Sequence, residues 1–182
     1  MWDGEPIVDV VEDRLGARGE PLSDLVRPHR RTGEVVAVVG APGMGKSAVL
    51  RSVARQGEVT GYRVLSDAVT DDGTAVFDRL AAILREADDD ASTPLSHLLD
   101  RASARRPHLV VVDDVHLLPE PALAELTEIS RRLAGQPVLF VLSCDPRTAT
   151  RLPAEITRRT LRPLGPASAA VLLRRQPTVV AG

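Results

Sequence analysis

The sequence predicts an α/β fold, a three-layer sandwich in which helices cover both faces of a mostly parallel five-stranded sheet. Unbroken apolar runs at 35–39, 109–112 and 137–142 are typical of strands buried on both faces. Between these runs, apolar residues recur with the helical period of about 3.6 residues. Strands that alternate with amphipathic helices form βαβ units, and such units build a parallel sheet.

The first half of the pattern contains two strands and three helices. A helix is expected at 46–56, directly after the strand at 35–39, and a weaker strand at 61–69. Two amphipathic helices follow, separated by a polar break at 87–94. The residues expected to face the core in the three helices are Val49, Leu50 and Val53, then Val76, Phe77, Leu80, Ile83 and Leu84, then Leu95, Leu98, Leu99 and Ala102.

The second half repeats the alternation. An amphipathic helix at 121–133 connects the apolar strands at 109–112 and 137–142. A last strand is expected at 159–164, and a further helix at 167–175. The core-facing residues of the connecting helix are Leu123, Leu126, Ile129 and Leu133. In such sheets, ligands bind beyond the carboxyl ends of the strands, so these ends are where a site is expected.

Composition and charge restrict the class of protein. With 182 residues, 43% of them hydrophobic, the chain is long enough to enclose one sizeable core. Aromatic residues make up only 2%, so that core must consist of Val, Leu, Ile and Ala. The net charge of −2 argues against bulk electrostatic binding to nucleic acid or to an anionic membrane. Arginines near 27–31 and 158–162 are interpreted as solvated faces.

Location follows from what the sequence lacks. No stretch approaches the roughly 18 apolar residues of a membrane span. The N-terminus carries early acidic residues and no long apolar run, so it does not resemble a secretory signal. The single cysteine, Cys144, excludes an intrachain disulfide, which suits a reducing compartment. We therefore expect a cytoplasmic protein.

A glycine-rich segment, GAPGMGKS, occupies 40–47 between a predicted buried strand and a predicted helix. It matches the pattern G-x-x-x-x-G-K-S/T of a phosphate-binding loop. The glycines let backbone amides point inward, and the following helix N-terminus favours an anion. Lys46 is predicted to reach the β- and γ-phosphates, and Ser47 to place its hydroxyl on Mg²⁺. The residues predicted to bind nucleotide here are Gly40, Ala41, Pro42, Gly43, Met44, Gly45, Lys46, Ser47 and Ala48.

A second signal lies at 109–116, where four apolar residues lead into the carboxylates of Asp113 and Asp114. An Asp-rich turn after a strand has the same letters, but the phosphate loop earlier in the chain favours a nucleotide site. Asp113 is predicted to hold Mg²⁺, and Asp114 to orient or deprotonate the attacking water. Asp114 and Lys46 are thus the predicted catalytic residues. His116 either senses nucleotide or, as we favour, packs locally in its loop.

Four segments occur in an order that resembles a known family: GEVVAVVGAPGMGKSAVL, LVVVDDVHLL, PVLFVLSCDPR and LRPLGPASAAVLLRR. They are similar to the ATPase module of the STAND and AAA+ branches of P-loop NTPases. The closest likeness is to the ATP-binding module of large LuxR-type bacterial regulators. The resemblance covers about 33–175. It implies a five-stranded parallel sheet with the two motif strands adjacent, followed by a small helical lid.

The resemblance also divides the chain into an N-terminal extension at 1–33, a P-loop ATPase core at 34–164 and the start of a truncated lid at 165–182. It implies ATP rather than GTP, in agreement with the lack of an Asn-Lys-x-Asp motif. Ser143 or Arg147 is implied as the polar sensor near the γ-phosphate. An ordinary turn around Asp145 fits the same letters, so both interpretations of this segment stay open.

By resemblance, the chain is expected to be an ATP-binding, slowly hydrolysing switch module of a bacterial regulatory protein. Its second acid is Asp114 instead of the longer Glu of the most active relatives, so we expect a weak Mg²⁺-dependent ATPase. Expected partners are ATP or ADP, and further domains of the same chain or a second copy. Two alternatives stay open: a module that binds ATP or ADP without turnover, and an AAA+-type ATPase that remodels nucleic acid. The chain is read as a fragment of a longer regulator or a shortened stand-alone member.

Overall fold

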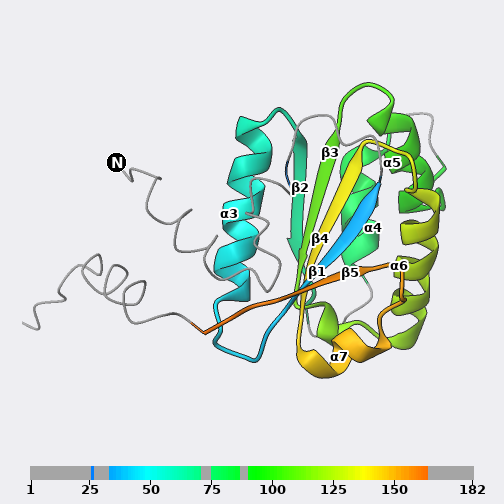
Figure 1. The fold of residues 1–182 in the computed structure, drawn as a ribbon. Helices are drawn as coiled ribbons and strands as arrows, with labels where there is room; N and C mark the ends of the chain where they lie inside the picture. The colour runs from blue at the N-terminus through cyan, green and yellow to red at the C-terminus, as the bar shows by residue number, and fades with distance from the viewer. Residues whose placement is uncertain (1–25, 27–32, 71–74, 87–89, 164–182) are drawn as a thin grey trace, which may run out of the picture.

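The computed structural model describes residues 26, 33–70, 75–86 and 90–163, and its centre is one parallel sheet of five strands (Figure 1). The strands are β1 (Glu34–Val39), β2 (Arg63–Ala68), β3 (His108–Asp113), β4 (Val138–Cys144) and β5 (Thr157–Thr160). Their order in the sheet is β2-β3-β4-β1-β5, and every pairing is parallel. The predicted lid helix at 167–175 lies outside the described residues, as does the predicted extension at 1–33 except for Val26 and Gly33.

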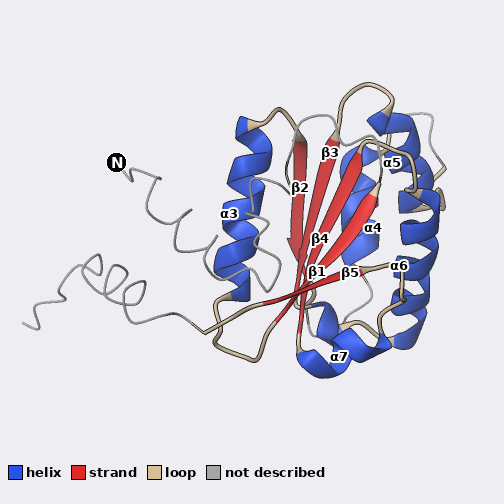
Figure 2. Ribbon diagram, viewed as in Figure 1, coloured by secondary structure: helices blue, strands red, loops and turns tan. Residues whose placement is uncertain are grey.

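Helices cover both faces of the sheet, which confirms the three-layer prediction (Figure 2). On one face, α3 (Lys46–Val59) packs its buried residues against Val36 and Val38 of β1. On the other face lie α4 (Val76–Leu84), α5 (Leu95–Ser103) and α6 (Glu120–Arg132), in a cluster that includes Val35 and Ala37. Successive residues of β1 therefore enter opposite layers, as a strand covered on both faces requires.

The strand order corrects one expectation, because the two motif strands β1 and β3 are separated by β4. All seven residues of β4 are buried, whereas β2 and β5 carry exposed residues. A strand without exposed surface belongs at the centre of a sheet, and partly exposed strands suit its edges. The register places Ser143 of β4 beside Val38 of β1 and one residue beyond the pair Val112–Leu142. Ser143 therefore lies level with Asp113.

The helical stripes are largely as predicted, and the exceptions have simple causes. Ile83 is 52% exposed instead of buried. The buried side of α4 includes Ala81 and is centred near Leu84, and Ile83 lies about 90° around the helix from that centre. Ala102 is half-buried, and the other predicted helix residues are buried. α3 continues beyond the predicted end to Val59. Among the described residues, no helix is long and apolar enough to cross a membrane.

The predicted limits of the last strand are also corrected. β5 begins at Thr157 and ends at Thr160, earlier than the predicted 159–164, because its first residue already pairs with Val36 of β1. Its side chains are polar and only partly buried, so hydrophobic patterning does not identify this strand. The apolar Leu161, which suggested a later strand, instead packs on the α3 face of the sheet.

His108, the first residue of β3, is a buried titratable group at the edge of the sheet opposite the carboxyl ends. Its side chain is 1% exposed, and Nδ1 lies 2.9 Å from the carbonyl oxygen of Arg106. A carbonyl can only accept, so Nδ1 carries the proton. No described group hydrogen-bonds the buried Nε2. Burial lowers the pKa of His108, and the charges of Arg63 and Arg106 lower it further, although the bond to the Arg106 carbonyl opposes them.

The lowered pKa of His108 predicts that the free energy of unfolding falls as the pH drops below about 6.5, the ordinary value for histidine. In that range the unfolded chain binds a proton that the folded chain excludes, so acid favours unfolding. Urea unfolding at pH 7.5 and pH 5.5 measures the difference. His108→Gln should reduce it, whereas His97→Gln, at an exposed position of α5, should leave it in place. An equal pH dependence in wild type and His108→Gln contradicts the assignment.

Candidate nucleotide-binding site

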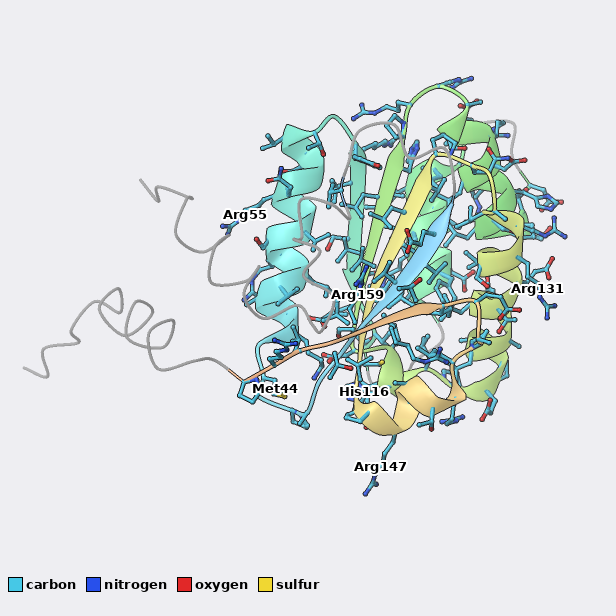
Figure 3. The ribbon with its side chains drawn as sticks, viewed as in Figure 1. Met44, Arg55, His116, Arg131, Arg147 and Arg159 are labelled. Atoms are coloured by element: carbon cyan, nitrogen blue, oxygen red, sulfur yellow. The ribbon has the colours of Figure 1, made fainter. Side chains whose placement is uncertain are left out.

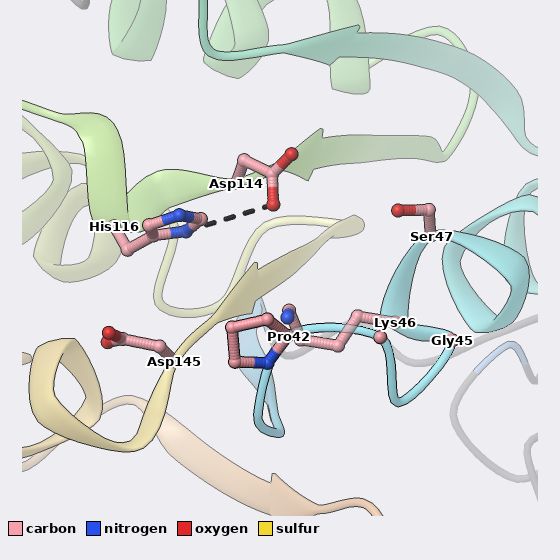
Figure 4. A pocket seen from close by; sticks show the side chains of 8 residues that line it. Pro42, Gly45, Lys46, Ser47, Asp114, His116 and Asp145 are labelled. Carbon is pink, nitrogen blue, oxygen red and sulfur yellow. Dashed lines mark ion pairs between the residues drawn. The ribbon is translucent and has the colours of Figure 1, made fainter.

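The carboxyl ends of β1, β3 and β4 meet at one edge of the sheet, and three connecting segments begin there (Figure 1). The glycine-rich loop at 40–45 follows β1, the 3₁₀ turn Val115–Leu117 follows β3, and the helix α7 (Pro146–Arg151) follows β4. Together they enclose a cleft of about 490 Å³. The residues that line it are Pro42, Gly43, Gly45, Lys46, Ser47, Asp114, His116 and Asp145 (Figure 4).

The glycine-rich loop takes a backbone conformation that most residues resist. Gly43 has φ of 76° and Gly45 has φ of 80°, both in the left-handed region. A Cβ at Gly43 would meet no atom within 4 Å, so backbone conformation and not crowding requires glycine there. Gly45 directly precedes α3, and no side chain caps that helix. The N-terminus of a 14-residue helix therefore faces the cleft with its partial positive charge, which favours an anion.

Lys46 adds a full positive charge to the same wall and is the only lysine in the sequence. Its side chain is 8% exposed, and Nζ donates to the carbonyl oxygen of Ala41 at 3.4 Å, a long hydrogen bond. A largely buried ammonium with one weak neutral partner among the described residues calls for an anion. Ser47 follows, with its hydroxyl facing the side of the cleft that holds Asp114 (Figure 4).

The two acids lie at the end of β3 and have different surroundings. Asp113 is the last residue of the strand, and its Oδ1 accepts from the Ser143 hydroxyl and from the Asp114 amide, the latter at 3.1 Å. Asp114 is 41% exposed and faces the cleft. Asp114 has φ of 59° and ψ of 40°, and among the described residues it is the one non-glycine with positive φ. Such conformations concentrate at functional sites, where surrounding contacts hold them.

His116 and Asp145 complete the wall opposite the glycine-rich loop. The Nδ1 of His116 lies 3.7 Å from Oδ1 of Asp114. Asp145 accepts the backbone N–H of Thr148 at 2.7 Å, and this bond lowers the pKa of its carboxyl, with help from His116 and Arg147. Asp145 is therefore the N-cap of α7. The sequence contains a signal for this cap, since Asp followed by Pro is typical of a helix start, but the motifs predict neither α7 nor a place for Asp145 in the site.

Not every predicted site residue lines the cleft. Pro42, Gly43, Gly45, Lys46, Ser47 and Asp114 do. Gly40, Ala41, Met44 and Ala48 belong to the same loop and helix start but are not among the residues that line the cleft, and neither is Asp113. Arg147 is exposed on α7, and its side chain extends into solvent away from the body of the domain (Figure 3). The structure therefore does not bring Arg147 together with the other predicted residues of its own chain.

The thiol beside the cleft is inert. Cys144 is fully buried at the end of β4, and its carbonyl accepts the N–H of Gly40 at 3.1 Å. Burial, reinforced by the charge of Asp145, raises the pKa of the thiol to about 11. A thiol with so high a pKa is neutral near pH 7 and a poor nucleophile. Cys144 therefore links the glycine-rich loop to β4 through its backbone.

The oxygen donors around the cleft fit Mg²⁺. The Ser47 hydroxyl and the Asp113 and Asp114 carboxylates are hard oxygen ligands of the kind Mg²⁺ prefers. Among the described residues no hydrogen bond reaches Oδ2 of Asp113, so this oxygen is available to a cation. No group of three or more His, Cys, Asp or Glu side chains within the described ranges could hold a metal by itself. This donor set suits an ion held partly by substrate phosphates.

A family model for an AAA domain matches residues 29–152, which span β1 through α7 and include the glycine-rich loop and both acids. The match covers more than half of the sequence. The chain belongs to the AAA domain family. This match agrees with the parallel sheet and the phosphate-binding loop after β1, and it confirms the AAA+ part of the resemblance. The STAND and LuxR-type part stays a prediction.

Solved structures share this AAA fold. The fold is similar to that of Cdc6p from Pyrobaculum aerophilum, with a TM-score of 0.56 and 16% identity over 84% of this chain and 45% of that one. It is also similar to that of a DNA replication initiation factor, with a TM-score of 0.51 and 18% identity over 93% and 48%. The chain thus spans less than half the length of either protein, and the likeness concerns the fold alone. No curated protein sequence matches the chain.

Proposed function

We propose that this AAA domain binds ATP with Mg²⁺, hydrolyses it slowly, and serves as the nucleotide-dependent switch of a bacterial regulatory protein. The observation that carries the proposal is the cleft in which Lys46 and Ser47 face Asp114 (Figure 4). Its one wall is positive, through a helix N-terminus and a buried ammonium, and its other wall is acidic. A polyphosphate with a bound cation is complementary to both walls.

Each residue has a separate task in this proposal. The amides of the glycine-rich loop and the first turn of α3 bind the β- and γ-phosphates, and Lys46 neutralises part of their charge. Ser47 and Asp113 would hold Mg²⁺, which supplies charge stabilisation at the phosphate oxygens. Asp114 lines the cleft and is 41% exposed, so its carboxylate would orient a water for attack on the γ-phosphorus, accept a proton from it, and let ADP leave. Met44 packs against the α3-side core, close to Gly40.

The surroundings of the cleft support slow turnover. Fast phosphoryl transfer usually needs an arginine at the γ-phosphate, worth about 10³–10⁵ in rate. No arginine is among the described residues that line the cleft. Arg151 pairs with Glu120, and Arg158 donates to the carbonyl groups of Ala149, Leu152, Pro153 and Ile156 at the end of α7. Arg147 points outward. It can therefore contact a phosphate only in another copy of the domain, or in its own cleft if α7 takes a different position.

The regulatory part of the proposal rests on the resemblance to LuxR-type and STAND modules. In a switch, the nucleotide changes contacts with other domains of the same chain or with a second copy. α7 and β5, the two elements that follow Asp145 in the chain, are suited to transmit such a change. α7 is capped by Asp145 inside the cleft, and Arg158 of β5 holds its last carbonyls. A nucleotide that displaces Asp145 therefore acts on both elements.

An ATPase that remodels nucleic acid is a second candidate, favoured by the likeness to two solved structures, Cdc6p and a DNA replication initiation factor. The net charge of −2 gives no bulk attraction to phosphate backbones. Binding to single- or double-stranded DNA that weakens steeply between about 50 and 200 mM salt would support this candidate. A nucleotide-binding module without turnover is the other alternative. Binding of ATP without any release of phosphate would support it.

Lys46→Ala should weaken ATP binding in the presence of Mg²⁺ by about ten- to hundredfold, because a hydrogen bond to a charged group contributes roughly 1.5–3 kcal/mol. Calorimetric titration measures the affinity. Arg55→Ala, which removes an exposed cation from the same helix, is the matched control and should bind like wild type. Since Lys46 is the only lysine, ATP should also slow acylation of its amine, read by mass spectrometry. Unchanged affinity in Lys46→Ala refutes the site.

The two acids should separate binding from chemistry. Asp113→Asn should remove most of the gain in ATP affinity that Mg²⁺ provides. Asp114→Asn should retain binding but lower turnover by about 10²-fold, the range of a lost general base. Asn tolerates the left-handed backbone of residue 114, so the fold is preserved. Asp100→Asn, at an exposed position of α5, controls for loss of negative charge. Equal turnover in wild type and Asp114→Asn shows that Asp114 is not the base.

Residues 1–182 alone should hydrolyse ATP at well below about 1 s⁻¹, the low end for enzymes, because no described arginine lines the cleft. Phosphate release is measured over a hundredfold range of protein concentration. If a second copy supplies the arginine, the specific rate rises with concentration in wild type and Arg131→Ala but stays flat in Arg147→Ala. Fast hydrolysis at all concentrations contradicts the slow-switch proposal.

A further inference from the structure

Ser143 is a polar residue in an otherwise apolar central strand. It is the sixth residue of β4, its exposed fraction is 0%, and the strand is buried along its whole length. Its neighbours in the sheet are Val38 on one side and, one step past the Val112–Leu142 pair, Asp113 on the other. A buried hydroxyl in this position needs hydrogen-bond partners, and both of its partners are parts of the acid pair.

The hydroxyl of Ser143 makes one hydrogen bond to each acid of the pair. It accepts the backbone N–H of Asp114 at 2.9 Å and donates to Oδ1 of Asp113. A serine hydroxyl has a single proton, and here that proton is directed at a carboxylate. In this arrangement Ser143 has no proton to donate to a phosphate oxygen. The structure therefore gives Ser143 a different task from the γ-phosphate contact that the family resemblance implied.

The two bonds act on different properties of the acids. The bond to Oδ1 orients the Asp113 carboxylate and leaves Oδ2, which no described group hydrogen-bonds, for a cation. The bond from the Asp114 N–H holds the backbone of Asp114 in the left-handed conformation, in which its carboxylate lines the cleft. Because non-glycine residues adopt this conformation only when surrounding contacts enforce it, Ser143 is one of its supports.

We propose that Ser143 is a positioning residue that couples the metal-binding carboxylate of Asp113 to the orientation of Asp114, and that β4 therefore responds to the metal ion and not to the γ-phosphate. The inference deepens the proposed function and rests on it where nucleotide is concerned. It distinguishes two kinds of dependence. A contact with the γ-phosphate affects ATP alone, whereas a contact that acts through the metal affects ATP and ADP alike.

The nucleotide experiment measures the affinities of ATP and ADP with Mg²⁺ and with EDTA, and takes their ratio as the gain from Mg²⁺. Ser143→Ala should reduce this gain by about three- to tenfold for both nucleotides, the effect of one lost hydrogen bond, and leave the affinities in EDTA unchanged. Ser143→Thr, which keeps the hydroxyl, should restore most of it. Ser103→Ala, at a buried serine of α5 whose hydroxyl bonds the Asp100 carbonyl, should have no effect. A loss confined to ATP, or no loss, overturns the proposal.

A second experiment needs no nucleotide. Ser143→Ala and Asp114→Gly are combined in a double-mutant cycle, with urea unfolding at pH 7.5 as the readout. Glycine adopts the left-handed conformation without support, so Ser143→Ala should lower the unfolding midpoint less in the Asp114→Gly background than in wild type. Additive effects of the two substitutions refute the support of Asp114 by Ser143. If wild type fails to bind ATP, the proposed function is wrong, and this cycle still decides whether Ser143 holds Asp114.

Discussion

Burial of both faces of the sheet is the constraint on which the rest of this AAA domain depends. β4 has seven buried residues, and β1 sends successive side chains into opposite cores. Such strands have little room for polar groups along their length, because each buried polar group needs a hydrogen-bond partner. Polar residues therefore collect where the strands end. Since all five strands are parallel, the carboxyl ends of β1, β3 and β4 bring their polar residues to one edge.

The position of β4 at the centre turns this edge into a connected site. On its β1 side, the Cys144 carbonyl accepts from Gly40 at the start of the glycine-rich loop. On its β3 side, Ser143 binds both acids. The strand that lies between the two motif strands is thus the one that joins the glycine-rich loop to the acid pair. Two adjacent residues of a buried strand therefore connect the acids to the phosphate loop.

Local features were predictable because local chemistry decides them. The left-handed glycines of the loop, the start of α3 directly after Gly45 and the buried stripes of α5 and α6 follow from residue types and spacing. β5 was misplaced because its polar residues Thr157–Thr160 form a strand through pairing with β1, and not through their own pattern. The prediction that Ile83 is buried is wrong for a related reason, since the packing of α4 against the sheet selects which side of an apolar helix is buried.

The sequence by itself determined the parallel α/β class, the phosphate loop with Lys46 and Ser47, and the acids after β3, because each depends on neighbours within one turn or strand. Only the tertiary structure decided that β4 separates β1 from β3, that Ser143 directs its one proton to Asp113, and that Arg147 points away from its own cleft. These features depend on the order of strands and the direction of side chains. Both are set by long-range packing, in which residues distant in the chain compete for the same buried positions.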